Sequence, residues 1–508
     1  MFSDILRRTV RQSGDRIAIR HGERSLKYQE LWDRSCRLAD ALRAAGVEPG
    51  EAVASLGRNR AESLEEVTAV ALGGFVRSPL YWQDAPERQA FMIKRVGAVA
   101  LIVDHEAWPA LKSALEREGI ALKLVLVRGE GDYDAALARA SSDDPQVQTA
   151  YDATYIIRFS AGTTGTPKPI AHSERGYHLA NVELMLTGPG MDETDVYLAV
   201  SPYSHGSGNL VWPFVTQGAK HVVMQGFDAD EALRLIEQER CTTLFLVPTM
   251  IQRLLSSPLC GKTDLSSIRR IIYGAAPIPQ DMIKGALATF GDVLYQNYGQ
   301  SEIVPLTVLT PADHRADADG ATGRLRSAGR PSPNSFVRIE NDAGDILPPG
   351  ELGEIVGFGP GAMLGIYGDE KASSERFTKD GWIRTNDMGW LDDKGYLFVT
   401  DRKDDMIISG GFNIAPAELE SALVAHPAVI EAVVFGAPHP QWGSTPVGVV
   451  RLKPSASVTE TDLIAWCVQQ VGGLKKPTKI IFASEPLPIG SAGKLLRRVA
   501  KTTYSAQL

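Results

Sequence analysis

Short apolar runs alternate with amphipathic stretches from about residue 50 to about residue 310, and this alternation limits the fold more than any other feature. The apolar run Ala52–Leu56 precedes the helical pattern Ala61–Leu72, and the helical pattern Asp230–Glu239 precedes the apolar run Thr243–Val247. Alternating strands and helices are typical of parallel sheets covered by helices. We therefore predict an α/β fold with a large N-terminal domain of helix-covered parallel sheets.

The pattern changes after about residue 320, where turns containing Asp-Ala-Gly, Pro-Pro-Gly and Asp-Lys-Gly separate short strands. Such turns predict an antiparallel piece, which we expect to form a small β-barrel. The charged run 401–405 then precedes a small α+β region. Its expected elements are helices Pro416–Val424 and Thr459–Val471 and strands Val429–Phe435, Val447–Leu452 and Lys479–Phe482.

The length of 508 residues is too great for a single hydrophobic core. We predict an N-terminal domain over residues 1–401 and a C-terminal domain over residues 402–508. The net charge of −8 argues against a partner nucleic acid. No apolar stretch is long enough to span a bilayer, and the residues after Met1 lack the apolar core of a signal peptide. We therefore expect a cytoplasmic protein whose four isolated cysteines are reduced thiols: Cys36, Cys241, Cys260 and Cys467.

A loop rich in glycine and threonine, Ser160–Lys168, leaves the predicted strand Tyr155–Phe159. Glycines let the backbone approach phosphate oxygens, N–H and hydroxyl groups donate hydrogen bonds, and Lys168 adds positive charge. The P-loop of ordinary NTPases is excluded, because Pro167 precedes the lysine and Pro169 follows it. Local sequence leaves two interpretations open: a phosphate cradle and an ordinary surface turn.

A second candidate site lies at the carboxyl end of a predicted parallel strand, where open α/β sheets bind ligands. The residues there are Tyr298-Gly299-Gln300-Ser301-Glu302. A tyrosine can stack on a purine, and a glutamate can hold Mg²⁺ that bridges phosphates. Small residues at Gly274-Ala275-Ala276-Pro277 end the preceding strand and leave room for a flat ring. A strand end with a solvated acid is the alternative.

Further candidates lie in the C-terminal part of the chain. Asp387 follows a turn and can accept hydrogen bonds from ribose hydroxyls, or it can cap the turn itself. Arg402 can reach the same sugar or remain a surface charge. The turn Gly410-Gly411 opens a helix and permits close approach of a ligand, although a plain loop is equally compatible. Lys494 lies in a glycine-containing loop near the chain end, where a lysine can also be merely solvated.

The order and spacing of these motifs resemble the adenylate-forming superfamily, which includes acyl-CoA synthetases, firefly luciferase and the adenylation domains of peptide synthetases. The resemblance spans about residues 10 to 500. It implies that a carboxylate attacks the α-phosphate of ATP, giving an acyl-adenylate and pyrophosphate, and that a thiol then displaces AMP. The implied cofactors are ATP, Mg²⁺ and coenzyme A.

The resemblance also assigns the ATP-binding residues. Thr163, Thr164 and Lys168 would hold the β- and γ-phosphates. Ser301 would contact the α-phosphate and Glu302 the Mg²⁺. The residues enclosing adenine would be Gly274, Ala275, Ala276 and Tyr298.

The same resemblance assigns Asp387 and Arg402 to ribose. Lys494 would bridge the attacking carboxylate and the α-phosphate, where a fixed cation offsets the repulsion between two anions. Asp404 matches the hinge about which a mobile C-terminal domain would swing between two poses. In the second pose, Gly410 and Gly411 would line a pantetheine tunnel.

Some aryl-CoA ligases pack residues like Trp442 and Lys475 or Lys476 on the CoA nucleotide; Trp442 can equally be a half-buried core residue. Departures from the family pattern occur at four positions. Ala161 removes a hydroxyl from the phosphate loop, and Pro169 stiffens its exit. The other two are Asn386 in place of glycine, which is mild because asparagine tolerates positive φ, and Ile489 in place of a frequent lysine.

The residue His205 falls where the family builds its acyl pocket. Peptide-synthetase domains carry an aspartate near this position, so an amino-acid substrate is disfavoured. Glycine at positions 299, 206 and 208 leaves room for an aryl or medium-length acyl chain. The sequence therefore favours an aryl- or acyl-CoA ligase acting on a small carboxylic acid, with a homodimer left open. Alternatives are a ligase that loads a carrier-protein thiol, a luciferase-like oxygenase, and a non-catalytic binding protein.

Overall fold

The computed structural model describes the chain except for residues 130, 161–166, 189, 319–321, 410–411, 455, 474, 489–494 and 508, and except for the side chains of residues 412 and 413. The described residues form two compact units. Unit 1 contains Met1–Val337 and Gly357–Arg384, and unit 2 contains Arg338–Val356 and Thr385–Leu508. Unit 2 thus includes two segments that lie before the predicted boundary at residues 401 and 402.

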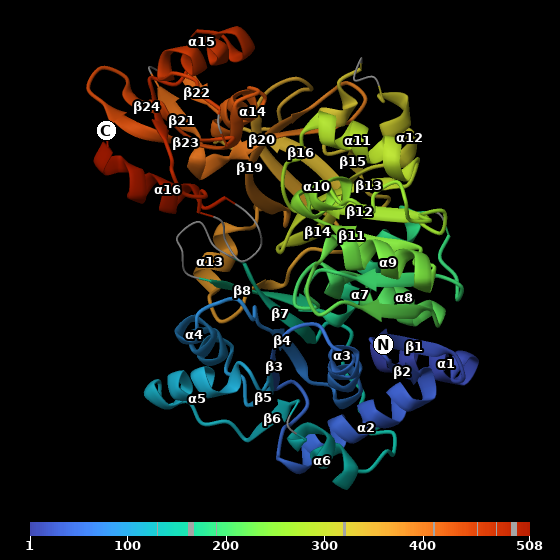
Figure 1. Ribbon diagram of the computed structural model, residues 1–508. Helices are drawn as coiled ribbons and strands as arrows, with labels where there is room; N and C mark the ends of the chain where they lie inside the picture. The colour runs from blue at the N-terminus through green and yellow to red at the C-terminus, as the bar shows by residue number, and fades with distance from the viewer. Residues whose placement is uncertain are drawn as a thin grey trace. The chain divides into compact units, whose positions relative to one another are not determined.

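Unit 1 contains two large sheets (Figure 1). The first has the strand order β15 (Arg330–Pro331), β14 (Ile303–Leu309), β13 (Leu294–Gln300), β12 (Arg270–Gly274), β11 (Thr243–Leu246), β9 (Val196–Ala199), β10 (Lys220–Val223), β1 (Ile17–His21) and β2 (Arg24–Lys27). The second has the order β18 (Gly365–Ile366), β8 (Lys168–Ser173), β7 (Thr154–Ser160), β4 (Val76–Pro79), β3 (Ala52–Leu56), β5 (Ala100–Asp104) and β6 (Leu124–Arg128). Their central strands pair in parallel, which confirms the predicted fold class.

Helices of unit 1 connect and cover these strands. They are α1 (Phe2–Ser13), α2 (Tyr28–Ala44), α3 (Glu62–Gly73), α4 (Pro86–Val96), α5 (Trp108–Arg117), α6 (Asp132–Arg139), α7 (Glu174–Leu186), α8 (Val211–Gln217), α9 (Ala229–Glu239), α10 (Pro248–Leu255), α11 (Gln280–Phe290), α12 (Pro311–Ala316) and α13 (Glu370–Glu375). Side-chain caps fix several starts: Asp228 accepts from the backbone N–H of Glu231 at the start of α9. In the described residues, no helix combines the length and apolar character needed to cross a membrane.

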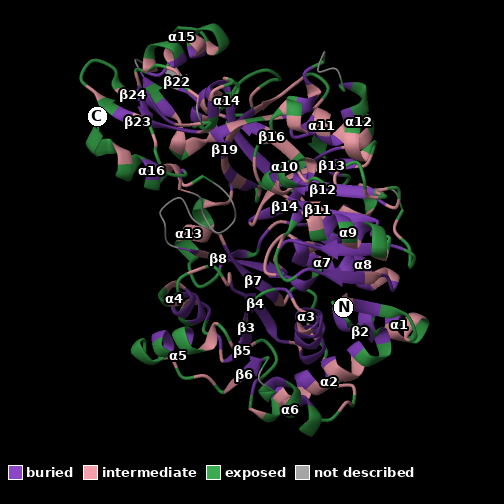
Figure 2. Ribbon diagram, in the orientation of Figure 1, coloured by how far each residue is buried: buried purple, intermediate pink, exposed green. Residues whose placement is uncertain are grey.

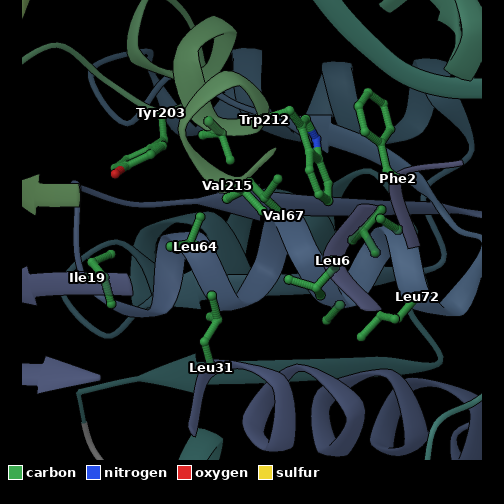
Figure 3. Packing of buried hydrophobic residues seen from close by; sticks show 14 of the residues in the cluster. Phe2, Leu6, Ile19, Leu31, Leu64, Val67, Leu72, Tyr203, Trp212 and Val215 are labelled. Carbon is green, nitrogen blue, oxygen red and sulfur yellow. The ribbon is translucent and has the colours of Figure 1, made fainter. Parts of the chain in front are cut away.

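The buried core of unit 1 joins segments that are far apart in the sequence. Figure 2 shows its strands as largely buried, with exposed residues on the helices and the connecting loops. In Figure 3, Phe2 of α1 lies beside Trp212 of α8, with ring centroids 4.3 Å apart in a stacked arrangement. Leu64 and Val67 of α3 contribute to the same cluster. The first helix is therefore part of the core and not a loose terminus.

Unit 2 contains two smaller sheets. One has the open order β16 (Phe336–Glu340), β17 (Gly353–Phe358), β19 (Ile383–Leu391) and β20 (Leu397–Arg402), which replaces the expected barrel with a four-stranded sheet. The other has the order β22 (Phe412–Ile414), β21 (Ile407–Ser409), β24 (Gly443–Leu452) and β23 (Val429–His439), with β25 (Lys479–Phe482) parallel to β24. The helices of unit 2 are α14 (Pro416–Val424), α15 (Glu460–Val471) and α16 (Arg497–Tyr504).

Candidate functional site

The ends of β12 and β13 bring two predicted motifs side by side in unit 1. The strands are parallel, with Gly274 opposite Asn297. A Cβ atom at position 274 would lie 2.2 Å from the carbonyl oxygen of Asn297, so glycine is required by the backbone of the neighbouring strand. Ala275 turns the chain out of β12 with a φ of 68°. The small residues therefore serve close strand packing at the ligand-binding edge of the sheet.

The residue before Tyr298 was not singled out from the sequence. The side-chain oxygen Oδ1 of Asn297 is buried and has no hydrogen-bond partner in the part of the chain that the structure describes. A buried acceptor without a donor is costly, and such atoms commonly face a ligand or an ordered water. Asn297 thus offers an acceptor next to the expected adenine position. In the sequence, the signal that could have identified Asn297 as a site residue was its position next to Tyr298.

Glu302 lies just beyond the end of β13 and is almost completely buried. Its Oε1 accepts a hydrogen bond from Nη2 of Arg376 at 2.7 Å, and its backbone oxygen accepts from the N–H of Met363 at 2.8 Å. Arg376 follows α13 and was not predicted as part of this site. Its positive charge compensates the charge of this buried carboxylate at the edge of the sheet.

The preceding residue, Ser301, is fixed through its backbone. Its carbonyl oxygen lies 2.7 Å from Nε2 of His172 on β8. Burial, with Arg158 as a second cause, lowers the pKa of His172 to about 3, so the ring is neutral at physiological pH. Because a carbonyl oxygen only accepts, Nε2 carries the proton and donates it to this hydrogen bond. A buried histidine thus anchors the segment that carries Ser301 and Glu302.

Lys168 begins β8 and pairs with Ser160 at the end of β7, so the two strands flank the predicted phosphate loop. Pro169 continues β8 opposite Phe159, and its carbonyl oxygen accepts from the N–H of Tyr367. Thr163, Thr164 and the departure at Ala161 lie outside the described residues.

His205 follows β9 in the segment predicted to form the acyl pocket. Its imidazole packs on the ring of Tyr81, with centroids 3.6 Å apart and an interplanar angle of 34°. Burial raises the pKa of Tyr81 well above its usual value, so that hydroxyl stays protonated. The pair brings together residues more than a hundred positions apart, and Tyr81 was not predicted from the sequence.

The glycines expected to leave room for an acyl chain have a different role. A Cβ atom at Gly206 would meet the ring of Phe245 at 2.5 Å, and one at Gly208 would meet the carbonyl oxygen of Tyr203 at 2.3 Å. At Gly299 the nearest atom would be the carbonyl oxygen of Ile303, at 2.7 Å. The interpretation of these glycines as open space is wrong, because each permits close packing of neighbouring chain.

Asp387 and Arg402 lie opposite each other on β19 and β20 of unit 2. The Nε atom of Arg402 lies 2.9 Å from Oδ1 of Asp387, and the backbone N–H of Asp387 donates to Oγ1 of Thr385. Asn386 has a φ of 58°, which confirms that asparagine serves here as a residue tolerant of the left-handed region. The two residues assigned to ribose therefore form one ion pair.

The charged segment after β20 includes the short 3₁₀ turn Lys403–Asp405. Asp404 is exposed and lies 3.3 Å from Nδ2 of Asn386, its donor. Lys403 pairs with Glu354, which precedes this segment, and Asp405 pairs with Arg497, which follows it. The predicted hinge residue thus lies between Lys403, which pairs with a residue earlier in the chain, and Asp405, which pairs with a later one.

Trp442 is 42% exposed and stacks on His439, with centroids 4.4 Å apart. Lys475 pairs with Glu418 at 2.8 Å, whereas Lys476 is exposed. The half-exposed tryptophan is not a core residue. Gly410, Gly411, Ile489 and Lys494 lie outside the described residues.

Comparison with known proteins connects these features. Residues 6–367 match the family model described as AMP-binding enzyme, and residues 418–494 match the AMP-binding enzyme C-terminal domain. A feruloyl-CoA synthase of an Amycolatopsis species is 35% identical over 96% of both chains. The fatty acid–[acyl-carrier-protein] ligase ScoC of Streptomyces coeruleorubidus is 31% identical over 95% of this chain and 92% of its own.

A solved structure has a similar fold. The amide bond synthetase McbA from Marinactinospora thermotolerans is 29% identical, with a TM-score of 0.88 over 99% of this chain and 100% of its own. The predicted boundary between residues 401 and 402 falls between the two segments matched by the family models.

Proposed function

Because this chain belongs to the family of AMP-binding enzymes, we propose that it is an ATP-dependent carboxylic acid–CoA ligase acting on an aryl or medium-length acyl acid. The carboxylate attacks the α-phosphate of ATP, forming an acyl-adenylate and releasing pyrophosphate. The thiol of coenzyme A then attacks the acyl carbon and AMP leaves. The observation that carries the proposal is the similarity to a feruloyl-CoA synthase along nearly the whole chain.

We assign residues to each part of the nucleotide. The adenine ring would lie against Tyr298 and the strand end Gly274-Ala275-Ala276, where Oδ1 of Asn297 can accept from its amino group. Lys168, with Thr163 and Thr164, would bind the β- and γ-phosphates. Asp387 and Arg402 would bind the ribose, the aspartate as the acceptor for its hydroxyls.

A Mg²⁺ ion fits this donor set. Mg²⁺ is usually held by one or two carboxylates together with substrate phosphates and water. Glu302 is a buried carboxylate at the ligand edge of the sheet, and Arg376 compensates its charge and orients it. When bound, the ion neutralises phosphate charge and orients the leaving pyrophosphate. Ser301, held through its carbonyl by His172, would contact the α-phosphate.

Charge stabilisation and orientation would supply most of the rate enhancement. Lys494 would bridge the carboxylate and the α-phosphate oxygens, both anionic, during adenylation. His205, packed on Tyr81, would line the acyl pocket and position the acid. Rotation at Asp404 would then exchange this pose for one in which Gly410, Gly411, Trp442 and Lys476 receive coenzyme A. Since the substrates are ATP and coenzyme A, we place the enzyme in the cytoplasm.

A carrier-protein thiol is the second candidate acceptor, because ScoC is a carrier-protein ligase by name. The exposed Trp442 favours coenzyme A, since a half-exposed aromatic ring suits stacking against its adenine. A carrier protein presents no adenine.

The test is pyrophosphate release across a panel of aryl and acyl acids with Mg·ATP, followed by addition of coenzyme A and detection of the thioester by mass spectrometry. We expect acid-dependent pyrophosphate and an acyl-CoA product. Reactions without acid, and reactions with a pantetheinylated carrier protein in place of coenzyme A, are the controls. Transfer to the carrier protein alone would select the second candidate. Absence of pyrophosphate with every acid would contradict the proposal.

A further inference from the structure

Arg158 on β7 is a buried arginine, most of whose N–H donors are unused within the described residues. Only 6% of the residue is exposed. Its Nη1 donates to Oδ1 of Asn209 at 2.7 Å, whereas Nε and Nη2 are buried and make no hydrogen bond within the described part of the chain. Among these described residues, no carboxylate lies within ion-pair distance of Arg158.

Two other buried arginines of unit 1 are paired with carboxylates. A third, Arg77, is 6% exposed and donates from Nη2 to the carbonyl oxygen of Tyr203 at 2.8 Å. Arg270 is 2% exposed and pairs with Asp195 at 2.9 Å. Arg128 is 3% exposed and pairs with Glu66 and Asp104. An arginine stays protonated even when buried, and an uncompensated buried charge is strongly unfavourable. Arg158 therefore differs from Arg270 and Arg128 in lacking a protein anion.

The two unused nitrogens have a specific geometry. Nε and Nη2 lie on the same edge of the planar guanidinium, so their N–H groups point in nearly the same direction. That edge matches the two oxygens of a carboxylate, which accept one hydrogen bond each. Asn209 occupies the remaining nitrogen and fixes the rotation of the group. The free edge is thus prepared for a planar anion.

The contacts of Arg158 place its guanidinium beside the segment predicted to form the acyl pocket. Asn209 lies four residues after His205, in the 3₁₀ segment Ser207–Leu210. The guanidinium lies 5.6 Å from the ring centroid of Tyr177, whose hydroxyl donates to the carbonyl oxygen of Gly208. Burial lowers the pKa of Arg158 and the charge of Arg77 lowers it further, whereas the electrostatic influence of Tyr177, Glu302 and Tyr81 raises it. Of these residues, Tyr81 is the one on which His205 packs, and Glu302 is the proposed Mg²⁺ ligand.

We propose that Arg158 binds a second carboxylate of the substrate, so that the acid activated by this enzyme is a dicarboxylic acid. One carboxylate reacts with ATP, and the other lies side-on against Nε and Nη2 of Arg158. This inference rests on the proposed function, because it concerns the acid of that reaction. With a neutral acyl chain, the buried guanidinium of Arg158 would lack an anionic partner in the enzyme–substrate complex, as it does among the described residues without substrate.

The test compares matched acids in the pyrophosphate assay: hexanoate with adipate, and benzoate with its three carboxy-substituted isomers. We expect wild-type kcat/KM to favour a dicarboxylic acid. Arg158→Met should lower that value about 10²–10³-fold, as expected when one partner of a buried charge pair is removed. The kcat/KM of Arg158→Met for monocarboxylic acids should differ less than about threefold from the wild-type value, since these acids make no contact with the Nε and Nη2 edge. Arg158→Lys should recover only part of the loss, because lysine keeps the charge but not the paired donors.

Thermal denaturation provides a second readout. The preferred dicarboxylate should raise the Tm of the wild type and not that of Arg158→Met, because a ligand stabilises only the state that binds it. Without ligand, Arg158→Met should have an equal or higher Tm than the wild type. Arg270→Met is the matched control and should have a lower Tm, because it leaves Asp195 buried without its partner.

Three outcomes separate the two proposals. Pyrophosphate release with monocarboxylic acids only would overturn the dicarboxylate inference and leave the proposed function intact. An equal loss with all acids in Arg158→Met would also overturn it, because the arginine would then act on the reacting carboxylate. If no acid gives pyrophosphate, the proposed function fails, and the ligand-dependent Tm decides the inference independently.

Discussion

Gly299 illustrates how packing limits single residues within the ligand-binding motif. It lies in β13, where the register with β14 is irregular between Tyr298 and Gln300, and its missing Cβ faces the backbone of Ile303 and Val304. A large side chain at this position would push on its own hairpin before it reached any acyl pocket. Substitution with tryptophan would therefore report on strand packing and would not measure pocket size.

Gly299→Ala should destabilise unit 1, because its Cβ would lie 2.7 Å from a carbonyl oxygen that belongs to a strand. Overpacking of this kind costs about 1–3 kcal/mol, which should appear as a lower denaturant midpoint. Gly226→Ala is the matched control, since nothing lies within 4 Å of its added Cβ and its φ is not positive. Equal midpoints for the two variants would contradict this account of Gly299.

Residues whose roles depend on the local backbone were the more predictable ones. The positive φ of Asn386 fits a residue that replaces the family's glycine, although the position lies in β19 and not in a turn. The motif Tyr298–Glu302 indicated a strand end. Arg158, Asn297 and Arg376 were missed, because each depends on which partners the tertiary fold supplies or withholds. No spacing along the sequence reveals an unused hydrogen-bond donor.

The short 3₁₀ turn Lys403–Asp405 lies between two sets of ion pairs, one made with residues before it in the chain and one with residues after it. Asp401, on β20, accepts from Arg497 and from the N–H of Ala417, both of which follow Asp404 in the chain. A rotation at Asp404 would break these two contacts. Arg497 also holds Asp405 and Glu420, so it would keep the following segment together as one body during that rotation.

Asp404→Pro should separate the two half-reactions, because proline fixes φ and restricts the residue before it. We expect acid-dependent pyrophosphate release to persist and transfer to coenzyme A to fall about 10²-fold, the loss typical of misplaced reacting groups. Asp393→Pro, in the exposed turn between β19 and β20, is the control and should leave both steps unchanged. Unaltered transfer in Asp404→Pro would mean that the hinge lies elsewhere.

Helices and strands were predicted well where periodicity is strong, and poorly where pairing is distant. The predicted helix Pro416–Val424 and strand Ala52–Leu56 have the observed bounds. The division of the N-terminal strands into two sheets was not predictable, because strand order depends on long-range pairing such as β1 with β10. Open pairing of β16, β17, β19 and β20 likewise replaced the expected barrel.

At the scale of the whole molecule, the proposed reaction uses residues of two compact units. The candidate adenine, phosphate and acyl residues belong to unit 1, and Asp387, Arg402 and Trp442 belong to unit 2. The family models likewise match two separate segments of the chain. We infer that adenylation and thioester formation depend on different residues of unit 2.

Measurement of the two half-reactions in Lys494→Ala tests this central claim most directly. The first is acid-dependent pyrophosphate release, and the second is the conversion of presynthesised acyl-adenylate to acyl-CoA. The account predicts that the first falls about 10²–10³-fold, as for loss of a group that stabilises developing charge, while the second keeps its wild-type rate. An equal loss in both half-reactions, or an undiminished first half-reaction, would contradict it.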